Sequence, residues 1–554
     1  VRHVAYETLS KRERKIRHLA AAAYVAEAFA NEDEVAEVLA SHYVAAFDAA
    51  PEAEDAQSIR SKAREMLARA GQRAGSLGAP DEGQRYYEQA AALADEPLLE
   101  AALLEQAGGQ AVRANRPVEA REQLERALNL YAQAGEMRAA ARASAALADA
   151  DLAEGRLEEG VARLEHAVAQ LEQGKPSGEL AGALAELGRM RVLSGHWEGA
   201  TAPLEQALTL AERLQLPRVF VEALTSKALV VVYQGRLAEA RILLEAAVQR
   251  AHLEQLYASA LRAENNLEWV LEASDRYGET LELLERSLAL ARRRGDRRWQ
   301  SNLRTGCLID LVLLGRWDEA LTISAEEEAD ASDEAAWSQL LFVTLIRCER
   351  GNLEPARAML ATRHGHRDSD NPQVRTGYAV VEARLLRAQG RPAEALAAAE
   401  GALAEVGQTP IFNTGNKLAL VEALEAALVL PDLDKAEDVL SIPESLDPGE
   451  LTPFLQGHSA RLRARLDAAR GNDEQVDKSF RTAAGLFSEF GLTFYLAVTQ
   501  LEYAEWLMER GRAEDAQPLL TQAQQTFDQL RATPWIERTT RAIHAGREPE
   551  GALS

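Results

Sequence analysis

Histidine and acidic side chains gather in one short polar segment, where His364, His366, Asp368 and Asp370 alternate with other residues. Imidazole and carboxylate groups are ligands that Zn²⁺ accepts. The segment has no helical pattern that would fix these groups relative to one another. We therefore interpret it as a polar surface loop and predict no metal site and no cofactor.

Nucleophilic catalysis and nucleotide binding each require a pattern that this sequence lacks. Cys307 and Cys348 are its two cysteines, and no histidine stands out as a base for either thiol. We predict two buried reduced thiols and no disulfide. Gly174-Lys175 is followed by Pro176 and has no glycine five residues earlier, so it is not a phosphate-binding loop. The chain is therefore predicted not to be an enzyme.

The sharpest charge feature is a basic run that comprises residues 292–294, Arg297 and Arg298 and is followed by Trp299. It could bind an anionic ligand or an acidic partner. Alternatively, it is a helix end and turn at which cations offset the helix dipole. Both interpretations stay open.

Asparagine and tryptophan side chains mark two predicted first helices of the repeat described below. Asn265, Asn266 and Trp269 lie on one, and Trp299 and Asn302 lie one repeat later. Amides and an indole on a concave wall suit a small polar ligand or a peptide. Together with Arg297 and Arg298, these residues form the predicted binding set, although tryptophan is also common in helix-pair cores.

A second basic segment lies near the N-terminus. Residues 1–18 carry six Lys and Arg against two acidic residues, a net charge of +4. Arg12, Lys15 and Arg17 are candidates for docking on an acidic face of another domain. An ordinary solvated helix is the alternative.

The elements that position these groups are revealed by a repeat. Gly155-Arg156-Leu157 recurs 40 residues later as Gly195-His196-Trp197, and again near residues 235, 275 and 315. Further copies stand near 351, 390, 471 and 511, and Asn115-Arg116 continues the register backwards. Glycine at the end of a helix favours the left-handed conformation that stops it.

Each copy has the same internal pattern. After Gly195, Ala200, Leu204 and Ala207 follow at helical spacing, so they predict one face of a second helix packed on the first. A single helix pair cannot bury this face alone, so neighbours must stack. The repeat predicts an all-α, right-handed superhelical solenoid of about a dozen helix pairs, with first helices lining the concave surface.

Interruptions of the repeat predict the division of the chain. Glu326–Glu328, residues 363–370 and 407–415, and Ser445–Pro453 interrupt the pattern. We expect linker helices over 1–50, a regular array over 51–330, irregular repeats with long loops over 331–455, C-terminal repeats over 456–546, and a flexible tail over 547–554.

The composition is typical of a helical protein, and the net charge restricts the kinds of partner that the chain can bind. Of 554 residues, 47% are hydrophobic but only 5% aromatic, and the net charge is −25. This charge repels nucleic-acid phosphates, and no apolar run approaches the length of a membrane span. We expect a cytoplasmic protein that contacts neither nucleic acid nor membrane.

The spacing of glycine, aromatic and small residues resembles the tetratricopeptide repeat (TPR), over about residues 55–530. The usual period is about 34 residues, so the longer period here implies about one extra helical turn. The resemblance implies a protein-binding solenoid, in the long form found in bacterial regulatory proteins.

The N-terminal segment resembles the linker that follows the nucleotide-binding module of bacterial signal-transduction (STAND) ATPases. Arg2-His3-Val4-Ala5-Tyr6 and Leu39-Ala40-Ser41-His42-Tyr43 match that pattern, except that His3 stands where aspartate is usual. The sequence of this segment is most similar to that of proteins that join an adenylate or guanylate cyclase domain, an ATPase module and a TPR array. Residues 502–507, Gly511-Arg512 and Ala532–Trp535 are similar to the ends of those proteins.

The resemblance implies a sensor and regulatory arm, with catalytic modules upstream of Val1. Its partners would be proteins, its own ATPase or cyclase domains, or a small-molecule inducer. Two alternatives stay open: a free-standing TPR scaffold that binds peptides, and the sensor region of a LuxR-type transcription regulator, to which such arrays are related.

Overall fold

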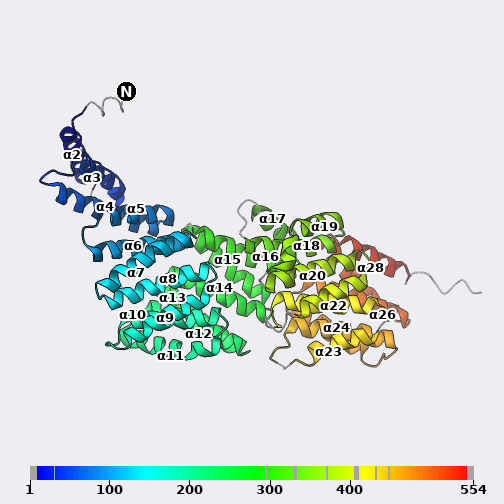
Figure 1. The fold of residues 1–554 in the computed structure, drawn as a ribbon. Helices are drawn as coiled ribbons and strands as arrows, with labels where there is room; N and C mark the ends of the chain where they lie inside the picture. The colour runs from blue at the N-terminus through cyan, green and yellow to red at the C-terminus, as the bar shows by residue number, and fades with distance from the viewer. Residues whose placement is uncertain are drawn as a thin grey trace, which may run out of the picture. The chain divides into compact units, whose positions relative to one another are not determined.

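The protein consists of helices joined by short turns (Figure 1). A computed structural model describes residues 9–545 except 30–31, 295, 328–332, 370–371, 405–410, 431–432 and 447–448. Twenty-seven α-helices and no strand occur in these residues. Successive helices pair, from α2 with α3 to α26 with α27. The predicted all-α repeat solenoid is confirmed.

The helices divide into two units. The N-terminal unit comprises residues up to Tyr233 together with Leu243–Ala263 and Arg294–Asp296. Its helices are α2 (Lys11–Ala28), α3 (Ala36–Ala49), α4 (Ala56–Ser76), α5 (Pro80–Ala92), α6 (Pro97–Arg113), α7 (Pro117–Gln133), α8 (Met137–Ala153), α9 (Leu157–Leu171), α10 (Gly178–Leu193), α11 (Trp197–Leu214), α12 (Pro217–Tyr233), and parts of α13 (Leu237–Leu253) and α14 (Tyr257–Ala273). Even-numbered helices are the first members of their pairs.

The C-terminal unit holds the remaining described residues. Its complete helices are α16 (Arg297–Leu313), α17 (Trp317–Glu327), α18 (Asp333–Glu349), α19 (Leu353–Thr362), α20 (Pro372–Ala388), α21 (Pro392–Leu403), α22 (Thr414–Val429), α23 (Leu433–Glu444), α24 (Pro453–Arg470), α25 (Val476–Glu489), α26 (Thr493–Glu509), α27 (Ala513–Leu530) and α28 (Thr533–Ala545), and α15 (Tyr277–Arg294) lies in it up to Arg293. First helices α18, α20, α22 and α24 lie side by side (Figure 1).

Turns within and between pairs use the same helix-ending geometry. Gly155, within a pair, and Gln215, between pairs, are both left-handed, with φ of 73° and 55°. The residue after each donates its N–H back to the preceding helix: Arg156 to the Asp151 carbonyl and Leu216 to the Ala211 carbonyl, both at 2.8 Å. Helices of 17 residues, such as α12 and α14, therefore alternate with short turns. The 40-residue period consists of two similar half-repeats.

Small side chains let paired helices approach closely. Ala200, Leu204 and Ala207 on α11 are all fully buried, as predicted. A Cβ added to Gly188 on α10 would lie 2.4 Å from Leu204 Cγ. The contact between α10 and α11 therefore depends on the absence of a side chain at Gly188.

In the C-terminal unit, late helices pack on turns far earlier in the chain. The Thr493 hydroxyl donates to the Leu314 carbonyl at 3.0 Å, across 179 residues. Arg350 Nε donates to the Leu530 carbonyl at 3.0 Å, across 180 residues. An open solenoid has contacts between neighbouring repeats only, so this unit closes on itself.

Asp275 anchors part of this closure. Its side chain is fully buried and accepts the backbone N–H of Phe454 at 2.6 Å and the hydroxyl of Tyr277 at 2.8 Å. Lys417, also fully buried, pairs with the same carboxylate and donates to the carbonyl of Glu272 at 3.3 Å. One side chain thus joins the end of α14 to α22 and α24.

The interrupted region departs from expectation in three places. Helix α17 ends later than predicted, since it continues to Glu327, and α22 already begins at Thr414. His364–Asp368 form a short 3-10 helix rather than an open loop, and the His366 N–H donates to the Arg363 carbonyl at 2.9 Å. Such tight turns are common connectors because they satisfy backbone groups locally. The break predicted over Ser445–Pro453 is confirmed, since α23 ends at Glu444 and α24 begins at Pro453.

Candidate functional site

Charged side chains connect the first helices of successive pairs, and we call the surface they share the first-helix wall. Arg189 on α10 pairs with Asp149 on α8 at 2.6 Å. Arg465 on α24 pairs with Glu425 on α22 at 2.7 Å. Residues one repeat apart are neighbours on this wall, so the repeat itself generates the ladder of arginine–carboxylate pairs.

In the C-terminal unit several rungs of this ladder are buried. Arg461 is 1% exposed and donates to Glu502 at 2.9 Å, and it also pairs with Glu425. Burial opposes the charge on Arg461, but these two carboxylates outweigh it and raise its pKa. Arg384 pairs in the same way with Glu422, which is 1% exposed. Buried charges need such partners, so the wall of this unit is structural.

The wall of the N-terminal unit is open. It contains a cavity of about 670 Å³ between α4, α5, α6 and α8. Its lining combines apolar and charged side chains: Glu65, Ala68, Arg69, Gln72, Tyr87, Leu99, Ala102, Leu103, Glu105, Gln106 and Arg142. Further along the wall, nothing lies within 4 Å of a Cβ added to Gly182 on α10. This unit therefore has room for a ligand.

A hydrogen-bonded polar group forms one side of the cavity. Glu105 is buried and accepts the Tyr131 hydroxyl at 2.9 Å and Arg142 Nη2 at 2.8 Å. Burial, together with Glu105, raises the pKa of Tyr131 to about 12. Arg142 is 52% exposed, so its remaining donors stay available to a ligand.

A second charged group continues the wall towards α14. Arg189 pairs with Glu186 at 2.7 Å as well as with Asp149, and Arg218 pairs with Glu222 at 2.9 Å. Burial opposes the charge on Arg189, but the nearby carboxylates outweigh it and raise its pKa. Acids and bases thus alternate along α8, α10 and α12.

The predicted binding residues lie on α14 and α16. Asn265, Asn266, Trp269 and Trp299 are partly buried, and Asn302 is exposed. The backbone of Arg297 and Arg298 begins α16, but their side chains lie outside the described residues. Their role in binding stays a prediction.

The predicted docking residues lie on α2, whose N-terminus is closed by a capping box of Ser10 and Glu13. Arg12 and Arg17 are exposed. Lys15 is mostly buried and pairs with Asp55. Docking through Arg12, Lys15 and Arg17 stays a prediction, and Lys15 already has an internal partner.

The thiols are buried, as predicted. Cys307 and Cys348 are 2% and 4% exposed and form no disulfide. Burial raises the pKa of each to about 12, so both are protonated at neutral pH.

Within the described residues, the histidines of the polar segment form no metal site. His364 Nδ1 lies 3.4 Å from the Tyr378 hydroxyl. Asp370 lies outside the described residues, within which no group of three or more potential ligands is placed to hold a metal.

The sequence did not identify the charged residues of the wall. Arg142 and Arg189 lie on helices that were predicted, but a charged residue on a helix is usually solvated. The sequence does contain one indication of these residues: each arginine stands about one repeat away from a carboxylate, as Arg189 does from Asp149.

No described helix is both long and apolar enough to cross a membrane.

No protein-family model and no curated protein matches this chain. Solved structures do. A Podospora anserina putative kinesin light chain with nearly identical TPR-like repeats is 22% identical, with a TM-score of 0.30, over 37% of this chain and 99% of its own. A chain of the APC/C hetero-tetramer Cut9–Hcn1 is 12% identical, with a TM-score of 0.45, over 88% of this chain and 96% of its own.

Proposed function

We propose that this chain is a non-catalytic binding module that takes a segment of a partner protein along the first-helix wall of its N-terminal unit. The observation that carries the proposal is the contrast between the two walls. In the C-terminal ladder Arg461 and Arg384 are 1% and 5% exposed, whereas in the N-terminal ladder the Arg142 and Arg218 side chains are 52% and 74% exposed. Arg142 also lines the cavity of about 670 Å³.

A peptide suits this surface better than a compact ligand. The open wall extends over successive first helices, α4 to α12, and neighbouring packed helices lie about 10 Å apart. An extended segment can contact several such helices at once. The cavity adds Leu99, Leu103 and Tyr87 as apolar contacts, which a peptide side chain can cover.

Selection of peptides from a random library on the intact protein tests the proposal. We expect Ala102→Trp, which fills the cavity from α6, to weaken the selected peptides about tenfold or more. The matched control is Ala132→Trp on the exposed face of α7, which should change affinity by less than about twofold. Failure to select any peptide, or equal binding to the Ala102→Trp variant, would refute the proposal.

The finer proposal is that this module is the sensor and regulatory arm of a signal-transduction ATPase that controls a cyclase. It is supported by the resemblance of residues 1–50 and by the exposed Arg12 and Arg17 on α2. A bound segment or inducer would shift the arm between two states. A free-standing scaffold, or the sensor region of a transcription regulator, is the alternative.

The intact mass of the native gene product, taken from the source cell, separates these possibilities. A mass far above 60.5 kDa with ATPase and cyclase peptides would support the regulatory arm. A mass near 60.5 kDa would leave the scaffold, and DNA-binding peptides would point to the regulator.

A further inference from the structure

Four arginines come together on the first-helix wall of the N-terminal unit, and we call them the arginine cluster: Arg113 on α6, Arg189 on α10, Arg218 on α12 and Arg262 on α14. Arg218 lies close enough to Arg113, and Arg189 to Arg262, to affect their titration. These residues are far apart in sequence, so the curvature of the array brings them together.

Two members of the cluster already hold carboxylates. Arg189 binds Asp149 and Glu186, and Arg218 binds Glu222. Burial raises the pKa of Glu186 above its usual value.

Among the described residues, the other two members form no ion pair. Arg262 donates to the Ser226 hydroxyl at 2.6 Å, and no described carboxylate lies within ion-pair distance of it. Arg113 is exposed, and within the described part of the chain it forms no ion pair. Arginine side chains elsewhere in the chain commonly pair with acids, so this deficit is local.

The titration of these two side chains agrees with the geometry. Burial, and then Arg189, lower the pKa of Arg262 to about 10. Burial also lowers the pKa of Arg113, although the residue as a whole is exposed. Every other described arginine with a resolved shift, such as Arg142, Arg384 or Arg461, has a raised pKa. At Arg262 the nearby carboxylates only partly offset burial and Arg189.

The cluster is connected to the cavity. Tyr87 lines the cavity, and Arg113 lies close enough to influence its pKa. A segment seated in the cavity can therefore continue past Arg113 to Arg262. We propose that this segment is acidic and that Arg113 and Arg262 bind its carboxylates. The inference rests on the proposed function and specifies the chemistry of the partner.

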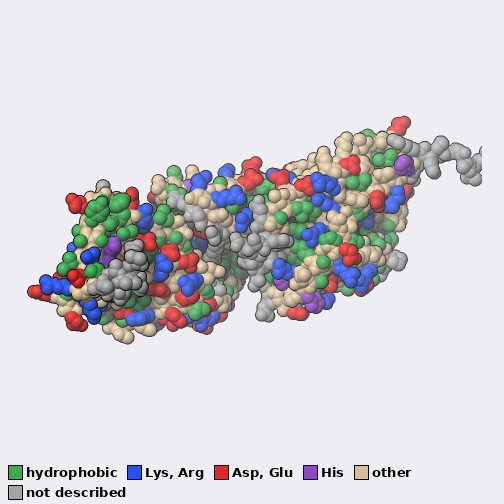
Figure 2. All heavy atoms as spheres, turned by 90° about the horizontal axis from the view of Figure 1, so that it is seen from above, with side chains coloured by type: hydrophobic (Ala, Val, Ile, Leu, Met, Phe, Trp, Pro, Cys, Tyr) green, Lys and Arg blue, Asp and Glu red, His purple; other side chains and the backbone are tan. Residues whose placement is uncertain are grey.

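Guanidinium groups suit this role because each presents paired donors to a carboxylate. The remainder of the molecule opposes an acidic partner, since the chain carries a net charge of −25. Acidic and basic side chains are interspersed over the face in Figure 2. An acidic segment would thus be favoured at the cluster and repelled elsewhere, which fixes its position.

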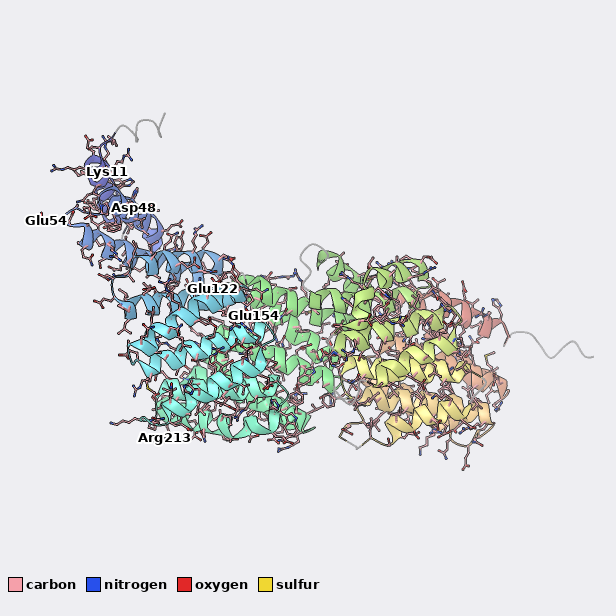
Figure 3. The ribbon with its side chains drawn as sticks, in the orientation of Figure 1. Lys11, Asp48, Glu54, Glu122, Glu154 and Arg213 are labelled. Atoms are coloured by element: carbon pink, nitrogen blue, oxygen red, sulfur yellow. The ribbon has the colours of Figure 1, made fainter. Side chains whose placement is uncertain are left out.

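Fluorescence anisotropy of a labelled hexaglutamate peptide with the full chain at low salt tests this inference. We expect hexaglutamate to bind and Arg113→Gln and Arg262→Gln each to weaken it about tenfold. The control is Arg213→Gln, an exposed arginine on the second helix α11 (Figure 3), which should change binding by less than about twofold.

The outcomes are distinguishable. Arg113 is exposed, so Arg113→Gln keeps the test valid if thermal melting shows that Arg262→Gln is unfolded. Absence of hexaglutamate binding, or equal binding to Arg113→Gln, would overturn the inference, whereas library peptides that still need the cavity would preserve the proposed function. Binding of inorganic pyrophosphate without hexaglutamate would also overturn it, in favour of a phosphate-bearing partner.

Discussion

Asp275 occupies a turn position at which Gly155, Gly195 and Gly235 stand in other repeats. All four residues are left-handed, and Asp275 has φ of 60°. Aspartate is less suited than glycine to this conformation, so its presence needs a reason. The buried contacts to Phe454 and Lys417 supply one, because no glycine could make them.

We expect Asp275→Gly to lower the free energy of unfolding by about 3 kcal/mol or more, because Lys417 would be left as an unpaired buried charge. Urea denaturation measures the change. Asn115→Gly is the control, since Asn115 is exposed at an equivalent turn with φ of 57°. It should change stability by about 0.5 kcal/mol or less. Equal effects of the two substitutions would show that Asp275 does not anchor the closure.

His458 provides a pH-dependent test of the same unit. Its ring is 1% exposed and lies 4.5 Å, centroid to centroid, from both Phe454 and Tyr495. Neither ring nitrogen has a hydrogen-bond partner among the described residues. Burial, and then Arg461, lower its pKa well below the usual value. The folded protein therefore holds His458 neutral.

The unfolded chain binds a proton at His458 near pH 6.5, whereas the folded chain does not, so stability is lost as pH falls through that value. When the pH is lowered from 7 to 5.5, this residue should lower the free energy of unfolding by about 1 kcal/mol. We expect His458→Phe to remove that part of the dependence in urea titrations at each pH. If the free energy of unfolding depended on pH in the same way in both proteins, His458 would become protonated in the folded state without loss of stability.

At the scale of the element, two glycines on one helix should respond in opposite directions. Gly188 faces Leu204, so Gly188→Ala should destabilise the protein by about 1–3 kcal/mol. Gly182 on the same helix has open space, so Gly182→Ala should be stabilising by about 0.5–1 kcal/mol through lower backbone entropy of the unfolded chain. Thermal melting of both variants tests this, and a stable Gly188→Ala variant would mean that α10 and α11 separate easily.

The elements were largely predictable from sequence because their causes are local. Left-handed turn residues such as Gly155 and Gly195, 40 residues apart, and the buried Ala200, Leu204 and Ala207 follow from helix-ending and packing rules that act within one repeat. The turns between pairs were missed where Gln215 takes the left-handed conformation, since glutamine gives no signal of it. Residues brought together by accumulated curvature, such as Arg189 and Arg262, could not be recognised from spacing.

At the scale of the molecule, the two units should transmit perturbations differently. Contacts across 179 and 180 residues join distant helices of the C-terminal unit, such as Leu314 with Thr493. The N-terminal unit packs chiefly through neighbouring helices, as α8, α10 and α12 do. Long-range closure makes unfolding cooperative, whereas nearest-neighbour contacts confine it.

Hydrogen exchange can measure this difference on the intact chain. We expect Asp275→Gly to speed amide exchange at the start of α22 and of α24, which lie 142 and 179 residues further along the chain, because both lose their anchor. Gly188→Ala should speed exchange in α10 and its neighbours while α4 keeps its protection, since no direct contact carries the perturbation further. A uniform increase in amide exchange across α4–α12 in the Gly188→Ala variant would instead mean that the N-terminal unit opens as one body. Its first-helix wall would then have to open as a whole when a partner binds.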